Sequence, residues 1–268
     1  MPDRADSTDS VDRVNHVLLE LGFTVHRAGD EIHGVAEVVP EMWAPGTKSL
    51  RTSILATWLD TAAGHLCIGV LAPRVPVTLE LDVHTYQPPP AAGSVHAIAR
   101  ILKAGRTVMV TSVDFTDQQG EPIAVGTASF MAAPDPGVSI DVDTVEMARQ
   151  ANQATAGRRL QVPLAERIGY ERPEPGVVVL HRSADGLNAS NTVNGGLIAV
   201  AVEEAALSTS PGTTLSSLAL RYLRPVRVGP AVARATVRSG LGQVEVRDSG
   251  SDDRLAVVAT TRTFSEGG

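Results

Sequence analysis

The residues with the clearest chemical potential lie in the second half of the chain, between Asp185 and Leu207. A polar turn there runs through Gly195 and Gly196 into an apolar segment with helical spacing, whose only charges are Glu203 and its neighbouring glutamate. Asn194 and the two glycines would lie at the helix N-terminus, where the first N–H groups lack intrahelical partners and the helix dipole is positive. Such a helix end favours an oxyanion.

A second carboxylate, Asp60, lies in the middle of the long apolar segment from Ser49 to Leu71, which we predict to be a helix. A carboxylate in this position is costly unless it has a partner or a function. Asp60 could instead face solvent or cap a loop. Together, Asp60 and the Gly195 helix end are the two candidate parts of a chemical site.

The elements of the first half are predicted in the order helix, strands, long helix, strands. Asp12 to Gly22 has apolar residues at helical spacing, and Phe23 to Val39 alternates around a turn, which is typical of two strands. Pro40 to Lys48 contains two prolines and a glycine and is predicted to be a loop. Strand-like runs follow the long helix at Val75–Tyr86, Gly93–Leu102, Arg106–Thr116 and Pro122–Ala132.

The second half repeats this order after a connector that holds a polar, helix-like stretch from Asp143 to Gln153. The predicted helix from Gly195 lies between two groups of strand-like runs. These are Leu164–Tyr170 and Val177–His181 before the helix, and Thr213–Leu223, Ala231–Val237, Gln243–Arg247 and Leu255–Phe264 after it.

The repeat indicates an internal duplication. Aligning Leu50–Ala63 with Val193–Ala206 brings Asp60 onto Glu203 without a gap. Two similar halves, each with one helix wrapped by an antiparallel sheet, predict an α+β architecture. We place the first unit at residues 11–133, the connector at 134–160 and the second unit at 161–265.

Composition excludes several other classes of protein. The net charge of -7 and the absence of clustered Lys and Arg argue against nucleic-acid binding. Cys67 is the single cysteine, so with no N-terminal leader we expect the reducing cytoplasm. No apolar run reaches the roughly 18 residues of a membrane span, and the seven histidines show no metal-ligand spacing. Met1 to Ser10 is predicted to be a frayed tail.

These residues resemble the hotdog-fold acyl-CoA thioesterases of the phenylacetate-pathway type, here as a double hotdog in one chain. That family's signature is an Asn, a His-Gly-Gly six residues later, and an Asp or Glu eight residues after the first Gly. Asn188, the Gly195 pair and Glu203 match this spacing, with Asn194 in place of the His. In the first half the aligned loop has lost the Asn and both glycines, whereas Asp60 remains. A polar strand residue also follows it, Thr78, eighteen residues later.

The resemblance implies that each site lies between two hotdog units. Asn188 and Gly195 of the second unit would face Asp60 and Thr78 of the first. The reciprocal second-site candidate would pair Glu203 with the degenerate loop that contains Pro45 and Thr52. We therefore expect one active site per chain, which uses Asp60 rather than Glu203.

The implied reaction is hydrolysis of an acyl-CoA thioester to a free acid and CoA, without a metal or other cofactor, since CoA is part of the substrate. The Gly195 N–H would stabilise the oxyanion, and Asp60 would act as general base or as nucleophile. Thr78 would orient either the attacking water or the carboxylate. Asn194 and Gly196 would complete the substrate-binding helix end. Three arginines could meet the phosphates of CoA: Arg221, Arg224 and Arg227.

Other interpretations remain open from the sequence. Asn188 could be a turn former, and the glycine pair could serve close helix packing. His65, five residues after Asp60, is similar to the Asp and His pair of hotdog enoyl-CoA hydratases, although their D-x-N-P-x-H loop is absent. The eroded first-half loop also suits a non-catalytic acyl-CoA binding or sensing protein. In either case we expect no membrane insertion and assembly into a homo-oligomer, as hotdog proteins often do.

Overall fold

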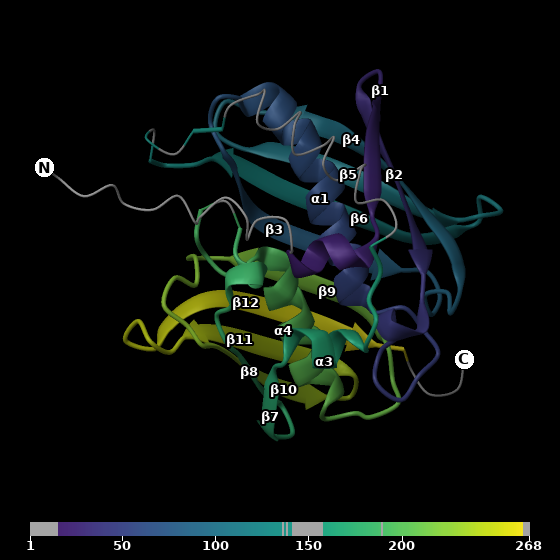
Figure 1. Cartoon of the computed structure of the whole chain (residues 1–268), viewed down its shortest axis with the longest axis vertical. Helices are drawn as coiled ribbons and strands as arrows, with labels where there is room; N and C mark the ends of the chain where they lie inside the picture. The colour runs from purple at the N-terminus through teal and green to yellow at the C-terminus, as the bar shows by residue number, and fades with distance from the viewer. Residues whose placement is uncertain (1–15, 136, 138, 141–157, 189, 265–268) are drawn as a thin grey trace, which may run out of the picture.

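The computed structural model of the chain describes residues 16–135, 137, 139–140, 158–188 and 190–264. These residues form one twelve-stranded antiparallel sheet with two long helices, α1 (Thr52–Leu71) and α4 (Gly195–Leu207). Figure 1 shows α1 against the strands of the first half and α4 against those of the second. The remaining elements of the first half are η2 (Val17–Leu21), β1 (Thr24–Ala28), β2 (Glu31–Val38), η3 (Pro40–Met42), β3 (Pro76–Thr85), β4 (Gly93–Ala104), β5 (Met109–Asp117) and β6 (Pro122–Ala132).

The second half has the corresponding set of elements. They are α3 (Leu164–Ile168), β7 (Glu171–Glu174), β8 (Val177–Leu180), η4 (Ala184–Gly186), β9 (Leu215–Tyr222), β10 (Ala231–Arg238), β11 (Leu241–Asp248) and β12 (Arg254–Thr263). The strand order is β1-β2-β4-β5-β6-β3-β9-β12-β11-β10-β8-β7. Strands β1 to β6 of the first half correspond in turn to β7 to β12 of the second. When each strand is replaced by its counterpart, the order reads the same from the opposite end of the sheet, as a pseudo-twofold duplication requires. The predicted α+β duplication is therefore confirmed.

The two halves join through β3 and β9, the first strand after each long helix. Their antiparallel register runs from Glu80 opposite Arg221 to His84 opposite Ser217. Arg221 also forms ion pairs across this join, to Glu80 at 3.1 Å and to Asp82 at 2.5 Å. The helices α1 and α4 contact each other and therefore lie on the same side of the joined sheet.

The core is built on α1, whose first eight residues are all buried. Its side chains pack on the sheet and on α4, with Ile54, Leu55 and Leu59 fully inaccessible to solvent. By length and composition α1 is apolar enough to cross a membrane, so the expectation that no segment reaches that length was wrong. In this structure more than half of the most apolar stretch of α1 is buried, as in the core helix of a globular unit.

One predicted strand is wrong. Leu164 to Tyr170 holds the short helix α3 in place of a strand. Pro163 precedes this helix and Gly169, with φ of 69°, ends it in the left-handed conformation. Leu164 and Ile168 are four residues apart and lie on one face of the turn.

The first predicted helix is a 3-10 helix from Val17 to Leu21. The tail of residues 1–10 and the helix-like stretch 143–153 lie outside the described residues.

Candidate active site between the two long helices

The N-terminus of α4 is formed as the sequence predicts. Asn194 caps the helix, since its Oδ1 accepts a hydrogen bond from the Gly196 N–H at 2.8 Å. The Asn194 N–H in turn donates to the Gly186 carbonyl at 3.0 Å. A Cβ on Gly196 would lie 2.6 Å from Thr57 Oγ1 of α1, so this glycine allows the two helices to touch. The helix end therefore lies directly against the other half of the chain.

Asp60 lies one turn beyond Thr57 on α1 and is partly buried. Its Oδ1 accepts a hydrogen bond from Thr78 Oγ1 at 2.7 Å, which is the contact expected between these two residues. Burial raises the pKa of Asp60 to about 6, against the opposing effect of the Thr78 hydrogen bond. In the described part of the chain Thr78 is the one hydrogen-bond partner of this carboxyl group, so Oδ2 can accept from another molecule.

A β-bulge in β3 brings Thr78 to Asp60. On this strand Leu81 and Val83 are fully buried against the helices, while Glu80 and Asp82 lie on the outer face. Strict alternation would place Thr78 on the outer face with Glu80. The pairing of β3 with β6 shifts register between Thr78 and Glu80, and the extra residue turns Thr78 to the helix side.

Tyr222, which no sequence motif marked, lies between the start of α4 and Asp60, the two parts of the candidate site. Its hydroxyl donates a hydrogen bond to the Gly195 carbonyl at 2.9 Å. Burial raises the pKa of Tyr222, and the negative charge of Asp60 raises it further. Tyr222 therefore contacts the start of α4 and lies within electrostatic reach of Asp60. The available signal was its place in the alternation of β9, two residues after the buried Leu220.

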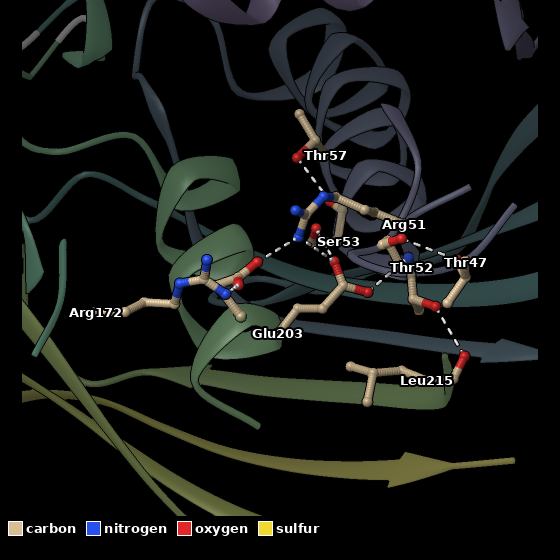
Figure 2. A network of polar contacts seen from close by, with 10 residues as sticks. Thr47, Arg51, Thr52, Ser53, Thr57, Arg172, Glu203 and Leu215 are labelled. Atoms are coloured by element: carbon tan, nitrogen blue, oxygen red, sulfur yellow. Dashed lines mark hydrogen bonds and ion pairs between the residues drawn. The ribbon is translucent and has the colours of Figure 1, made fainter. Parts of the chain in front are cut away.

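The pseudo-symmetric carboxylate, Glu203, is fully buried, and both of its oxygens accept hydrogen bonds from the protein. Oε1 accepts from the Thr52 N–H at 2.9 Å and Oε2 accepts from Ser53 Oγ at 2.5 Å, both at the start of α1. Figure 2 shows Glu203 of α4 directed at this helix end, with Arg51 beside it. Glu203 thus occupies the position at the N-terminus of α1 that corresponds to an oxyanion position at the N-terminus of α4.

An ion-pair network closes this second position. Arg51 is 2% exposed and lies 2.9 Å from Glu204 Oε2 and 3.8 Å from Glu203 Oε2. Arg172 contacts Glu204 from the other side at 2.8 Å. Burial raises the pKa of Glu203, whereas Arg51 and the two hydrogen bonds act in the opposite direction. The arrangement explains the loss of both glycines in the first half, because their positions are used to hold a carboxylate.

Asn188 is held within its own loop. Its Oδ1 accepts hydrogen bonds from the Ser190 N–H at 3.0 Å, and from the Thr192 N–H and Oγ1 at 3.2 and 3.0 Å. These contacts make Asn188 a turn former, one of the two roles considered above. The turn shapes the loop that enters α4, where Val193 donates to the Val226 carbonyl at 3.0 Å.

The remaining candidates divide by their partners. Arg221 forms ion pairs with Glu80 and Asp82, so its guanidinium group already has partners. Arg224 and Arg227 are exposed and form no ion pair within the described residues. His65 Nδ1 lies 2.7 Å from the Thr61 carbonyl of its own helix. In the residues that the structure covers, no three His, Cys, Asp or Glu side chains gather in a way that could hold a metal ion.

Cys67, two turns beyond Asp60 on α1, is not an activated nucleophile. Burial, together with the negative charge of Asp60, raises the pKa of its thiol to about 12. The thiol therefore stays protonated near neutral pH, and a nucleophilic cysteine needs the thiolate. The carboxyl group of Asp60 is therefore the candidate reactive group on this helix.

Comparison with known proteins agrees with this arrangement. Residues 53–124, from α1 into β6, match the family model of the thioesterase superfamily. The 12:0-ACP thioesterase from Umbellularia californica superposes with a TM-score of 0.63 at 15% identity, covering 90% of this chain and 100% of that one. An acyl-ACP thioesterase from Bacteroides thetaiotaomicron gives a TM-score of 0.59 at 13% identity, over 91% and 99% of the two chains. No curated protein sequence matches the chain.

At these identities the structural likeness shows the fold, and the sequence match concerns the first unit. The chain is therefore a double-hotdog protein, as predicted. Its first unit is similar to the thioesterase superfamily over residues 53–124, which supports thioester hydrolysis as the reaction class.

Proposed function

We propose that the protein hydrolyses acyl-CoA thioesters at one site per chain, between Asp60 of α1 and the Gly195 amide of α4. The observation that carries this proposal is the contrast between the two pseudo-symmetric carboxylates. Among the described residues Asp60 has one hydrogen bond, and its pKa is near 6, whereas both carboxylate oxygens of Glu203 accept hydrogen bonds within the protein. A group that must accept a proton or attack a carbon needs an available oxygen, which favours Asp60.

In the general-base route, Asp60 takes a proton from water as the water oxygen bonds to the thioester carbon. The carbonyl oxygen becomes negative and is stabilised by the Gly195 N–H at the positive end of α4. The C–S bond then breaks, the free acid forms, and the sulfur leaves as the CoA thiolate. The thiolate takes up the proton that Asp60 removed from water. In the nucleophilic route, Asp60 bonds to the carbon directly, the C–S bond breaks and the CoA thiolate leaves. Water then hydrolyses the mixed anhydride to the free acid and the Asp60 carboxyl group, whose proton passes to the thiolate.

A thiol-release assay with short, long and aryl acyl-CoAs tests the activity itself. Hydrolysis of one class, with wild-type protein, is the expected result. Tight binding of acyl-CoA without turnover would instead favour a binding or sensing protein and overturn the proposal.

CoA, rather than a bare thioester, is supported as the substrate by the arginines beside the loop that enters α4. Arg224 follows β9 in the segment whose Val226 carbonyl accepts the Val193 N–H at 3.0 Å. It is exposed and has no ion-pair partner among the described residues, so a phosphate can reach it.

Arg224→Ala is therefore expected to raise KM for acyl-CoA by about 5- to 10-fold with kcat unchanged, because it removes a contact to a phosphate far from the reacting carbon. The matching acyl-pantetheine thioester, which lacks the nucleotide, should show no change in KM. Arg234→Ala, on the outer face of the sheet, is the matched control. Equal KM values for the wild-type protein with the CoA and pantetheine esters would contradict recognition of the nucleotide. That result would favour an acyl group bound to a carrier protein as the substrate.

The pH dependence of the reaction should follow the ionisation of Asp60, since the carboxylate is the active form. With a pKa near 6, kcat/KM should be constant near pH 8 and fall towards tenfold per pH unit below about pH 6. Steady-state rates from about pH 4.5 to about pH 8 measure this limb. An acidic limb near pH 4 would show that Asp60 is not buried as described.

A further inference from the structure

Tyr222 is the last residue of β9, at the point where the two halves join. The final β3–β9 pair is Glu80 with Arg221, and these two side chains form an ion pair on the outer face. The next residue along the strand must face the helices, as the buried Leu218 and Leu220 do. Tyr222 therefore lies on the same side of the sheet as Thr78, which the bulge turns towards Asp60.

The hydroxyl of Tyr222 fixes one particular peptide unit. The Gly195 carbonyl accepts the Tyr222 hydrogen bond at 2.9 Å, and the N–H of the same peptide, that of Gly196, donates to Asn194 Oδ1 at 2.8 Å. This peptide is held at both ends. The Gly195 N–H, the proposed oxyanion donor, belongs to the preceding peptide, whose Asn194 carbonyl accepts the Ile198 N–H at 3.2 Å. With both neighbouring peptides held, the two backbone torsions of Gly195 and the direction of its N–H are set.

We propose that Tyr222 is a positioning residue, which holds the Gly195 amide of the second half in the geometry that the Asp60 carboxylate of the first half requires. This inference rests on the proposed thioesterase function. The phenol donates its proton to the Gly195 carbonyl, so Asp60 receives a hydrogen bond from Thr78 alone among the described residues and keeps its basicity. The phenol itself neither attacks nor transfers a proton.

Tyr222→Phe tests the inference because it removes the hydrogen bond and keeps the ring. We expect kcat to fall about tenfold, KM to stay within about twofold, and the acidic limb of the pH profile to stay in place, since a loosened oxyanion donor affects the transition state rather than binding. Tyr170→Phe, a buried phenol beside Arg51 and Glu204 in the closed network, is the control and should leave kcat unchanged.

Three results would overturn the positioning role. The first is an unchanged kcat in Tyr222→Phe. The second is a lower melting temperature with full activity per folded molecule, which is the mark of a merely structural residue. The third is a displaced acidic limb, which would make Tyr222 a direct partner of Asp60.

A double-mutant cycle with Gly195→Ala gives an independent readout. The φ angle of Gly195 is outside the left-handed region, so alanine fits the backbone, and its Cβ would lie 3.2 Å from Tyr222 Oη and 3.4 Å from Cζ. Gly195→Ala should lower kcat by displacing the ring, and the double variant should lose less than the product of the two single losses. Multiplicative losses would mean that the two residues act independently, contrary to the proposal.

The failure of this inference and that of the proposed function are distinguishable. An active Asp60→Asn protein would remove the proposed site, whatever Tyr222 does. An inactive Asp60→Asn protein with a fully active Tyr222→Phe protein would remove the positioning role alone.

Discussion

Asp60→Asn is expected to lower kcat on acyl-CoA thioesters about a thousandfold, with little change in KM. Asparagine keeps the size of the side chain and can still accept the hydrogen bond from Thr78, but it is neither a base nor a nucleophile. Removal of a general base or a nucleophilic carboxylate typically costs this much. Thiol release measured in single-turnover and steady-state conditions gives kcat and KM separately.

The same variant should be more stable than the wild type at pH 8, which separates lost chemistry from lost folding. The folded-state pKa of Asp60 is raised from 3.8 to about 6, so its ionisation disfavours the folded state as pH rises through this interval. Asparagine removes that cost, and we expect a gain of about 1 to 3 kcal/mol in urea unfolding at pH 8. At about pH 3, below both pKa values, the carboxyl group is mostly protonated in both states and the gain should nearly vanish.

Glu203→Gln is the matched control on the pseudo-symmetric carboxylate. Its folded molecules should retain full kcat, because Glu203 is enclosed by Thr52, Ser53 and Arg51 and does not meet substrate. If only the Glu203 change abolished activity, the assignment of the two carboxylates would be inverted.

Arg51→Met is expected to give the largest loss of stability, about 3 to 5 kcal/mol in urea unfolding at pH 8. Methionine fills much of the same space but leaves the carboxylates of Glu203 and Glu204 buried with one cation fewer. A buried charge that loses its partner is far costlier than an exposed one.

Two comparisons identify the cause of this loss. Arg100 forms ion pairs with Glu31 and Asp114 at 43% exposure, so Arg100→Met should cost less than about 1 kcal/mol. Arg51→Met should also be less destabilised at pH 5 than at pH 8, because a buried carboxyl group without its cation has a raised pKa and is neutral at lower pH. A loss independent of pH would indicate packing rather than unpaired charge.

The sequence alone was sufficient for the architecture and for naming Asp60 as the candidate carboxylate. Apolar residues at helical spacing located α1, the glycine pair located the start of α4, and the gap-free alignment of Asp60 with Glu203 revealed the duplication. These features are local or repeated, so each can be recognised within one stretch of chain. Leu164 to Tyr170 was misread because a five-residue helix and a short strand leave similar apolar patterns.

The tertiary structure decided how these parts meet. A bulge in β3 turned Thr78 to Asp60, and the packing of α4 on β9 brought Tyr222 to Gly195. The two residues of each contact belong to different elements. The burial of Glu203 by Arg51 and Ser53 likewise depends on helix packing across the pseudo-twofold axis. Strand register and side-chain burial are set by all neighbouring elements at once. Residue types and spacing could therefore name the two carboxylates and favour Asp60, whereas only packing showed that Glu203 is enclosed and that Asp60 keeps an available oxygen.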